Sequence, residues 1–110
     1  MLTFDSYQDS AAATAVYPQV GKNIAYPALG LGGEAGEVQN KVKKVLRDDG
    51  GVLTPDKRDA IADEIGDVLW YAAVLAREIG ASLEDIALRN IEKLKRRAAA
   101  GTLQGSGDKR

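Results

Sequence analysis

Hydrophobic residues recur along this chain at a spacing of three and four positions rather than alternating. Short runs rich in glycine, proline and aspartate separate the four segments that show this spacing. A period of about 3.6 residues is typical of amphipathic α-helices, whereas strands alternate with a period of two. The pattern therefore predicts an all-α fold, a bundle of helices over residues 4–16, 28–47, 55–79 and 83–100.

Capping residues mark most of the predicted helix ends. Thr3, Thr54 and Ser82 each stand just before a predicted helix, where a hydroxyl can accept a hydrogen bond from the first turn. Gly80 and Gly101 follow the third and fourth helices, where glycine readily adopts the left-handed conformation that ends a helix. Capping chemistry and hydrophobic spacing thus place these boundaries at the same positions.

The third predicted helix is apolar on almost every side over residues 68–76. A helix with this pattern is buried all round, and one small chain of four helices offers little to cover it. We therefore expect a homodimer or homotetramer whose interface uses this helix. The face expected at the interface consists of Trp70, Ala73, Val74 and Arg77. Trp70 is also a candidate for stacking on a nucleobase, although a core or interface role is more usual for such a residue.

The longest predicted loop covers residues 17–27 and contains two Tyr-Pro steps and Asn23. A loop of this length in so small a domain is often functional. Aromatic rings can stack on a nucleobase and an amide can bond to its edge, which makes Asn23 a candidate substrate-binding residue. The alternative is that Tyr17 and Tyr26 only cover one end of the bundle.

Two pairs of acidic residues occur on the second and third predicted helices. Glu34 and Glu37 are three positions apart, as are Glu64 and Asp67. Residues at this spacing share one side of a helix, so two facing helices would gather four carboxylates. Such a group needs a cation to offset its charge, and Mg²⁺ or Mn²⁺ suits oxygen ligands. Because the chain has no histidine or cysteine, zinc sites and histidine-containing di-iron sites lack their usual ligands.

Acids three positions apart more often belong to a solvated helix face. Glu34 and Glu64, however, lie beside the apolar stripes of their helices instead of opposite them. Gly36 and Gly66 interrupt the same helices at a cost of about 1 kcal/mol each relative to alanine. They indicate either a close approach of backbone, metal or ligand or tight packing between helices.

Several cations and one amide share helix faces that suit phosphate binding. Lys44 continues the face of Glu37 and can either meet phosphate oxygens or pair with acids on a solvated surface. On the fourth helix, Asn90 lies beside the apolar stripe with Lys93 and Arg97 on the same side. These three residues are either a satisfied amide with two surface cations or a group that binds sugar and phosphates.

Length and composition limit the class of protein. The 110 residues form one domain, and a net charge of −1 does not supply the basic field of a protein that binds nucleic-acid polymers. We expect no signal peptide and no membrane-spanning segment, hence no membrane partner, and a cytoplasmic location as the default. Residues 105–110 have the composition of a disordered tail, but we expect Lys109 or Arg110 to pack near the site or a neighbouring subunit.

The two acidic pairs, Glu34-x-x-Glu37 and Glu64-x-x-Asp67, resemble the metal-binding signature of the MazG-like all-α nucleoside triphosphate pyrophosphohydrolases, especially the short phage-type branch. The similarity covers nearly the whole chain and includes the segments at residues 26–31, 66–71 and 90–94. One departure is Gly33, where many family members have a further glutamate. The number of metal ions is therefore open.

The resemblance implies hydrolysis of a nucleoside triphosphate to the monophosphate and pyrophosphate by water that attacks the α-phosphorus. Its four acids would be catalytic and hold two or three Mg²⁺ or Mn²⁺ ions: Glu34, Glu37, Glu64 and Asp67. Glu37 is our choice of general base. Substrate-binding residues would be Asn90, Lys93, Arg97, Lys44, Asn23 and Trp70. Deoxynucleotides, and purines such as dGTP, are the expected substrates of a phage-type member that remodels the nucleotide pool in the host cytoplasm.

Two other functions stay open at this point. In the first, the chain is a non-catalytic helical oligomerisation module whose acids form only a charged face. In the second, it hydrolyses another nucleotide phosphoanhydride. Metal dependence separates the first from an enzyme, and the identity of the products separates the second from a triphosphate pyrophosphohydrolase.

Overall fold

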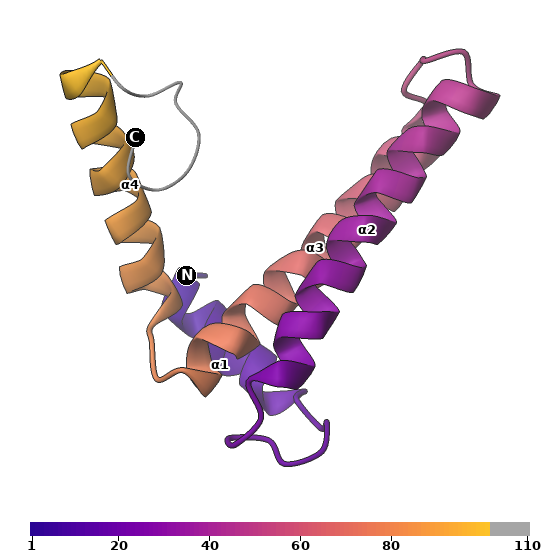
Figure 1. Cartoon of the computed structure of the whole chain (residues 1–110). Helices are drawn as coiled ribbons and strands as arrows, with labels where there is room; N and C mark the ends of the chain where they lie inside the picture. The colour runs from indigo at the N-terminus through magenta and orange to yellow at the C-terminus, as the bar shows by residue number, and fades with distance from the viewer. Residues whose placement is uncertain (102–110) are drawn as a thin grey trace.

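The computed structural model describes residues 1–101, which form four α-helices and no strand (Figure 1). The helices are α1 (Phe4–Ala13), α2 (Ala25–Asp48), α3 (Pro55–Glu78) and α4 (Leu83–Ala100). The predicted all-α fold is therefore confirmed. The role predicted for Lys109 and Arg110 concerns residues outside the described range. Within that range, no helix is long and apolar enough to span a membrane.

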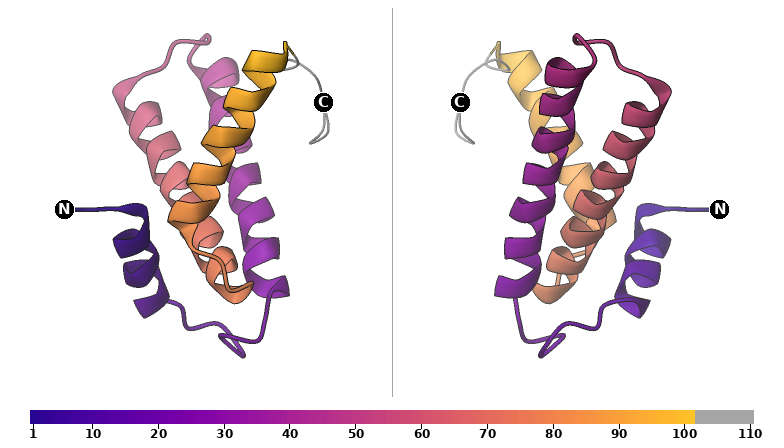
Figure 2. Two further views of the ribbon diagram at one scale, coloured as in Figure 1. Left: turned by 90° about the vertical axis from the view of Figure 1, so that its left-hand side faces the viewer. Right: turned by 90° about the vertical axis from the view of Figure 1, so that its right-hand side faces the viewer.

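The helices form a V, in which the antiparallel pair α2–α3 is one arm and α4 is the other (Figure 1). Helix α1 lies at the base of the V, beside α3 and on the side away from α2 (Figure 2). It contacts both α3 and α4, whereas α4 makes no backbone contact with α2 in the described part of the chain. The two arms are therefore joined only at their base.

The predicted N-caps are confirmed in all three helices that carry one. The hydroxyl oxygens of Thr3, Thr54 and Ser82 each accept a hydrogen bond from the backbone N–H three residues later, at 3.0, 3.3 and 3.2 Å. Gly101 ends α4 in the left-handed conformation, with φ of 73°. These local signals fix the ends independently of the packing between helices.

Two helix ends differ from the prediction by three residues, for local reasons, and two others differ by a single residue. Helix α1 ends at Ala13 because the Thr14 hydroxyl and backbone N–H both bond to the carbonyl of Ala11, which closes the last turn early. Helix α2 begins at residue 25 instead of 28, because the side-chain oxygen of Asn23 accepts a hydrogen bond from the Tyr26 N–H at 3.0 Å. Pro27 then falls in the first turn, where a proline interrupts no helical hydrogen bond.

The core lies at the base of the V, where α1 covers one side of α3. Ala73 and Val74 of α3 are buried against Ala11, Tyr17 and, from the start of α4, Leu83. Our prediction that the face of Trp70, Ala73, Val74 and Arg77 forms an interface between subunits is therefore wrong for its buried members. A helix that is apolar all round does not specify which neighbour covers which side, and here α1 of the same chain covers this one.

Gln8 of α1 ties three elements together inside the core. Its side-chain amide donates hydrogen bonds to the carbonyls of Ala73 at 3.1 Å and Ala81 at 3.0 Å. Its side-chain oxygen accepts a hydrogen bond from the backbone N–H of Leu83 at 3.1 Å. Gln8 is 9% exposed, so these bonds replace water as its partners and tie α1 to the interior of α3 and to the α3–α4 turn.

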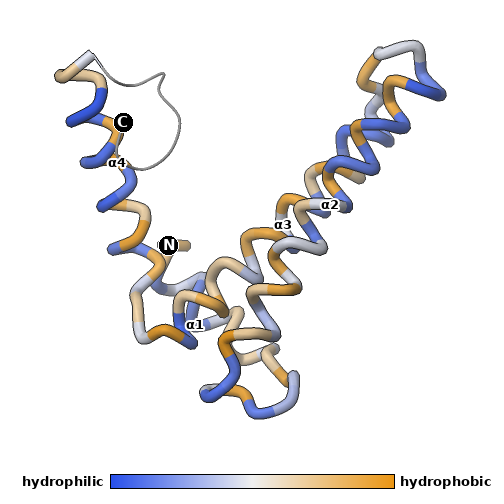
Figure 3. Tube along the Cα trace, in the orientation of Figure 1, coloured by the Kyte–Doolittle hydropathy of each residue, from blue (hydrophilic) through white to orange (hydrophobic). Residues whose placement is uncertain are grey.

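Apolar residues also recur along both arms of the V, outside the core (Figure 3). Ile65 of α3 and Ile79, which directly follows this helix, are more than half exposed, and on α4 the exposed apolar residues include Ile91 and Leu94. Monomeric proteins seldom leave apolar helix faces open in this way. The chain thus retains uncovered apolar surface, but on other faces than the one predicted.

Candidate functional site

The pairing of α2 with α3 brings acids from both helices together. Glu34 of α2 and Glu64 and Asp67 of α3 each offer a carboxylate oxygen, and these three oxygens lie within 4.8 Å of one another. Glu34 and Glu64 are half-buried between the helices, while Asp67 is exposed. Three of the four predicted acids therefore share one small volume, as the spacing indicated.

The closeness of these acids raises the pKa of the Glu34 carboxyl. The pKa of its carboxyl is raised, first by a hydrogen bond shared with Glu64, next by burial, and then by the negative charges of Asp67, Glu64 and Glu37. Each of these favours the protonated form, because a second negative charge in this volume is unfavourable. A divalent cation would remove that penalty by neutralising the group.

The donor set fits Mg²⁺ or Mn²⁺. Carboxylate oxygens are the ligands these ions prefer, and two ligands of one ion at about 2.1 Å can be at most about 4.2 Å apart. The observed separations of up to 4.8 Å need only small side-chain adjustments to meet this limit. Glu34, Glu64 and Asp67 are thus the residues that would hold a metal ion.

Glu37 lies outside this group of three oxygens. Its side chain is exposed on α2, yet its charge is among those that raise the Glu34 pKa, so it lies near the acidic group. The role of Glu37 as general base or as ligand of a further ion stays a prediction. The spacing of three positions places Glu34 and Glu37 on one side of α2 but does not bring both to α3.

Two tyrosines, Tyr7 of α1 and Tyr71 of α3, lie near the acids. The pKa values of Tyr7 and Tyr71 are both raised, mainly by burial and additionally by negative charge, from Asp67 for Tyr7 and from Tyr26, Glu34 and Asp67 for Tyr71. Tyr7 reaches this region from α1. Only the register between helices reveals the proximity, so the sequence pattern carried no signal for it.

The loop between α1 and α2 is anchored to the far end of α3. The Glu78 carboxylate accepts hydrogen bonds from the Tyr17 hydroxyl and from the backbone N–H groups of Gly21 and Asn23, the last two at 2.8 and 3.0 Å. The hydrogen bond from Tyr17 is the main cause of the lowered pKa of Glu78. Tyr17 also stacks on Tyr26, with ring centroids 4.7 Å apart. Both tyrosines thus help to hold this loop against α3.

Asn23, a predicted substrate-binding residue, is engaged inside this loop. Its amide nitrogen donates to the carbonyl of Pro18 at 2.9 Å and its oxygen accepts from Tyr26. A small cavity of about 190 Å³ lies beside it, lined by residues that include Tyr17, Val74 and Glu78. Glu78 follows Asp67 by eleven positions on α3, about 16 Å along the helix axis, so the Glu78 end of this cavity is distant from the acids.

Neither Trp70 nor Lys44 is among the three residues whose carboxylates meet, although Trp70 follows Asp67 by only three residues on α3. The Trp70 indole N–H donates to the Thr14 hydroxyl at 2.8 Å, and its ring packs on the core under α1. Lys44 is ten residues beyond Glu34 on α2, about 15 Å along the axis, and its charge contributes to the lowered pKa of Asp48. Both were predicted to bind substrate, and their positions favour structural and surface roles within one chain.

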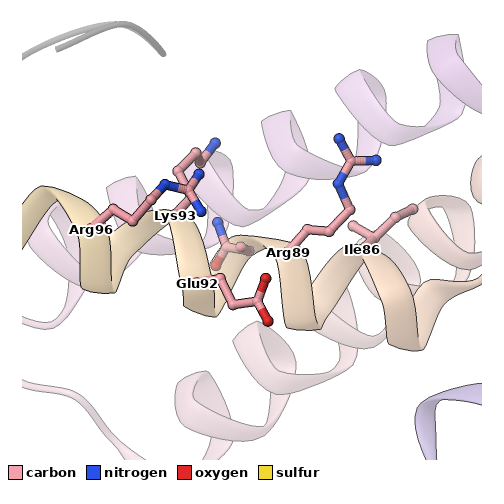
Figure 4. A pocket seen from close by; sticks show the side chains of 6 residues that line it. Ile86, Arg89, Glu92, Lys93 and Arg96 are labelled. Carbon is pink, nitrogen blue, oxygen red and sulfur yellow. The ribbon is translucent and has the colours of Figure 1, made fainter.

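Basic side chains of α4 line a hollow of about 410 Å³ (Figure 4). Its described lining residues are Ile86, Arg89, Asn90, Glu92, Lys93 and Arg96. Arg89 and Lys93 extend to one side of the helix, while Glu92 extends to the other. Arg97 is buried, at 6% exposure. Within one chain this face is not joined to the acids, because α4 does not contact α2.

Comparison with known proteins agrees with this arrangement. No solved structure matches the chain at a significant level. The Gene 37 protein of Mycobacterium phage L5 is 47% identical over 111 residues, which cover 96% of this chain and 97% of the relative. The family model of the MazG nucleotide pyrophosphohydrolase domain matches residues 27–101, which include both acidic pairs and α4. The chain therefore belongs to the family of MazG nucleotide pyrophosphohydrolase domains, as the acidic signature predicted.

Proposed function

We propose that this protein hydrolyses a nucleoside triphosphate, preferably a deoxynucleotide, to the monophosphate and pyrophosphate with Mg²⁺ or Mn²⁺ as cofactor. The observation that supports this most strongly is the meeting of Glu34, Glu64 and Asp67 between α2 and α3. Membership of the MazG family supports nucleotide pyrophosphohydrolase activity in general. The acids and the family thus point to the same chemistry.

In the proposed reaction, a water oxygen forms a bond to the α-phosphorus and the bond from that phosphorus to the α–β bridging oxygen breaks. Glu37 accepts the proton of the water, and pyrophosphate leaves with the bridging oxygen. Glu34, Glu64 and Asp67 hold the metal, with Glu37 as ligand of any further ion. When bound, the metal supplies positive charge that offsets the phosphate oxygens and acidifies water.

A second copy of this chain completes the site in our proposal. The exposed apolar faces of α3 and α4, with Ile65 on one and Leu94 on the other, are uncovered within one chain and suit burial against each other in a homo-oligomer. That arrangement brings a basic helix to an acidic site that binds a polyphosphate. Asn90 and Lys93 of α4 then contact the sugar and phosphates from the neighbouring subunit, with Arg89 as a further cation, whereas Arg97 is buried within its own chain.

The experiment for this proposal is a panel of ribo- and deoxynucleoside triphosphates incubated with Mg²⁺ or Mn²⁺, with products separated by chromatography. Monophosphate and pyrophosphate that vanish with EDTA support the reaction, and the panel ranks the bases, where we expect purine deoxynucleotides such as dGTP first. Nucleoside diphosphate as product would indicate a different bond. No turnover of any triphosphate by the folded protein would favour an oligomerisation module or another phosphoanhydride.

A further inference from the structure

Gly30 of α2 lies directly against the aromatic ring of Tyr71 of α3. A Cβ atom placed on Gly30 would be 2.5 Å from Cδ1 of that ring and closer still to Cε1 and Cζ. Ordinary contacts of a Cβ atom begin at 3.4 Å. Only a residue without a side chain allows the two helices to lie this close at this level.

This contact is one helical turn away from the acids on both helices. Gly30 precedes Glu34 by four residues, and Tyr71 follows Asp67 by four residues. Residues four apart lie one above the other on a helix, about 6 Å along the axis. The distance between α2 and α3 at Gly30 therefore determines their distance at the carboxylates.

Other glycines of α2 and α3 have no such neighbour. Around Gly32, Gly33, Gly36 and Gly66, a Cβ atom would meet nothing within 4 Å among the described residues. Tight packing within the chain, one of the two explanations considered for Gly36 and Gly66, is therefore not found. The close approach occurs instead at Gly30.

The Tyr71 ring also contacts the ring of Trp70. The Trp70 ring meets it edge-on, with centroids 4.9 Å apart and planes at 89°. Trp70 is itself held by the hydrogen bond from its indole N–H to Thr14 and by the core beneath α1. A side chain at position 30 would thus push against a ring whose neighbour Trp70 is fixed to the core, and we expect the helices to separate.

We propose that the contact between Gly30 and Tyr71 sets the spacing of the metal-binding carboxylates, with both as positioning residues. The proposal rests on the metal site put forward above. Relief of the overlap needs a movement of about 1 Å, whereas ligand distances in a metal site tolerate about 0.2 Å. Loss of such positioning contacts lowers metal affinity about 10- to 100-fold in other proteins.

The test is Mn²⁺ affinity, measured by electron paramagnetic resonance without substrate, in the Gly30→Ala variant and in Gly32→Ala as matched control. Both substitutions add one methyl group to the same helix, but only the first meets a neighbour. We expect affinity to fall at least 10-fold in Gly30→Ala and to be unchanged in Gly32→Ala. Equal affinity of wild type and a folded Gly30→Ala variant overturns the proposal.

Variants at Tyr71 show whether the effect passes through the ring. In a Tyr71→Leu background, which removes the ring, Gly30→Ala is expected to cost no further affinity, whereas in Tyr71→Phe, which keeps the ring, it still does. If Gly30→Ala alone does not fold, the double variant Gly30→Ala/Tyr71→Leu must fold, and an unfolded double variant overturns the proposal. Wild-type protein that binds no Mn²⁺ would instead refute the metal site itself.

Discussion

The carboxyl group of Glu34 on α2 lies next to that of Glu64 on α3, and hydrogen bonding between the two carboxyls is the largest cause of the raised pKa of Glu34. In the absence of metal, one carboxyl of the pair therefore retains a proton to higher pH than an isolated glutamate. The short distance between the two carboxylates is unfavourable without metal. It also allows both carboxylates to bind one metal ion. Protonation and metal binding thus compete for the same oxygens.

The metal-free protein should lose stability from Glu34 as pH rises. Because the folded state raises the Glu34 pKa above its ordinary value of 4.5, its contribution to stability is present below 4.5 and lost as pH rises through the raised pKa. Glu34→Gln removes this loss. In EDTA, thermal melting should give the variant a higher Tm than wild type at neutral pH and no advantage below pH 4.5. If Tm differed between Glu34→Gln and wild type by the same amount at all pH values, ionised Glu34 would not be the cause of the lower stability.

Mn²⁺ should stabilise the folded protein through the three carboxylates. A ligand at about 100 times its Kd stabilises by about 2.7 kcal/mol, since it binds only the folded site. Glu64→Gln should abolish this gain in Tm. The matched control is Asp63→Asn, which removes an exposed acid from the preceding position of α3 and should keep the gain. A gain that survives in Glu64→Gln would place the metal elsewhere.

The Tyr17 hydroxyl should stabilise the loop that joins α1 and α2. Tyr17 is buried and donates to Glu78, and burial together with this bond raises its pKa to about 12. Tyr17→Phe should lower the free energy of unfolding by about 1–2 kcal/mol at neutral pH, measured by urea denaturation. The wild-type advantage should fade as pH rises from the ordinary value of 10 through 12.

The control for that measurement is Tyr26→Phe. Its ring also takes part in the stack with Tyr17, but its hydroxyl is not the one bonded to Glu78. It should change the free energy of unfolding far less. Equal effects of the two substitutions would show that stacking, and not the hydrogen bond, holds the loop.

Mixed oligomers should test whether α4 acts on a neighbouring subunit. Glu64→Gln lacks the acidic site and Lys93→Ala lacks a cation of α4, so each homo-oligomer should be inactive or nearly so. After subunit exchange of equal amounts, half of the dimers carry both chains and one intact site, which gives about a quarter of wild-type activity. No recovery, with exchange verified by mass spectrometry, would mean that α4 acts on its own chain.

The four helices could be predicted from the sequence because hydrophobic spacing and capping are local properties. Thr3, Thr54 and Ser82 cap as expected. The packing was less predictable: the apolar surface of α3 includes both Ala73, which α1 covers, and Ile65, which is 54% exposed, and the spacing does not distinguish them. The partner of each face depends on where the loops direct α1 and α4.

The acidic site was predictable to the extent that it depends on spacing along single helices. Glu34, Glu64 and Asp67 meet as expected. The distance between helices is a different property, since it depends on register, so Gly30 and Tyr71 gave no signal beyond a glycine in a helix and an apolar aromatic residue. Substrate binding by Asn23 stays a prediction, and the sequence did not reveal its local role, because the same amide that suits a nucleobase also suits the start of a helix.

The most direct test of the proposed reaction is hydrolysis of dGTP in ¹⁸O-labelled water with Mg²⁺, with both products analysed by mass spectrometry and Glu64→Gln run in parallel. Attack at the α-phosphorus predicts one labelled oxygen in the monophosphate, none in pyrophosphate, and turnover at least 100-fold lower in Glu64→Gln. Label in pyrophosphate, or unchanged turnover in Glu64→Gln, would contradict hydrolysis at the three carboxylates.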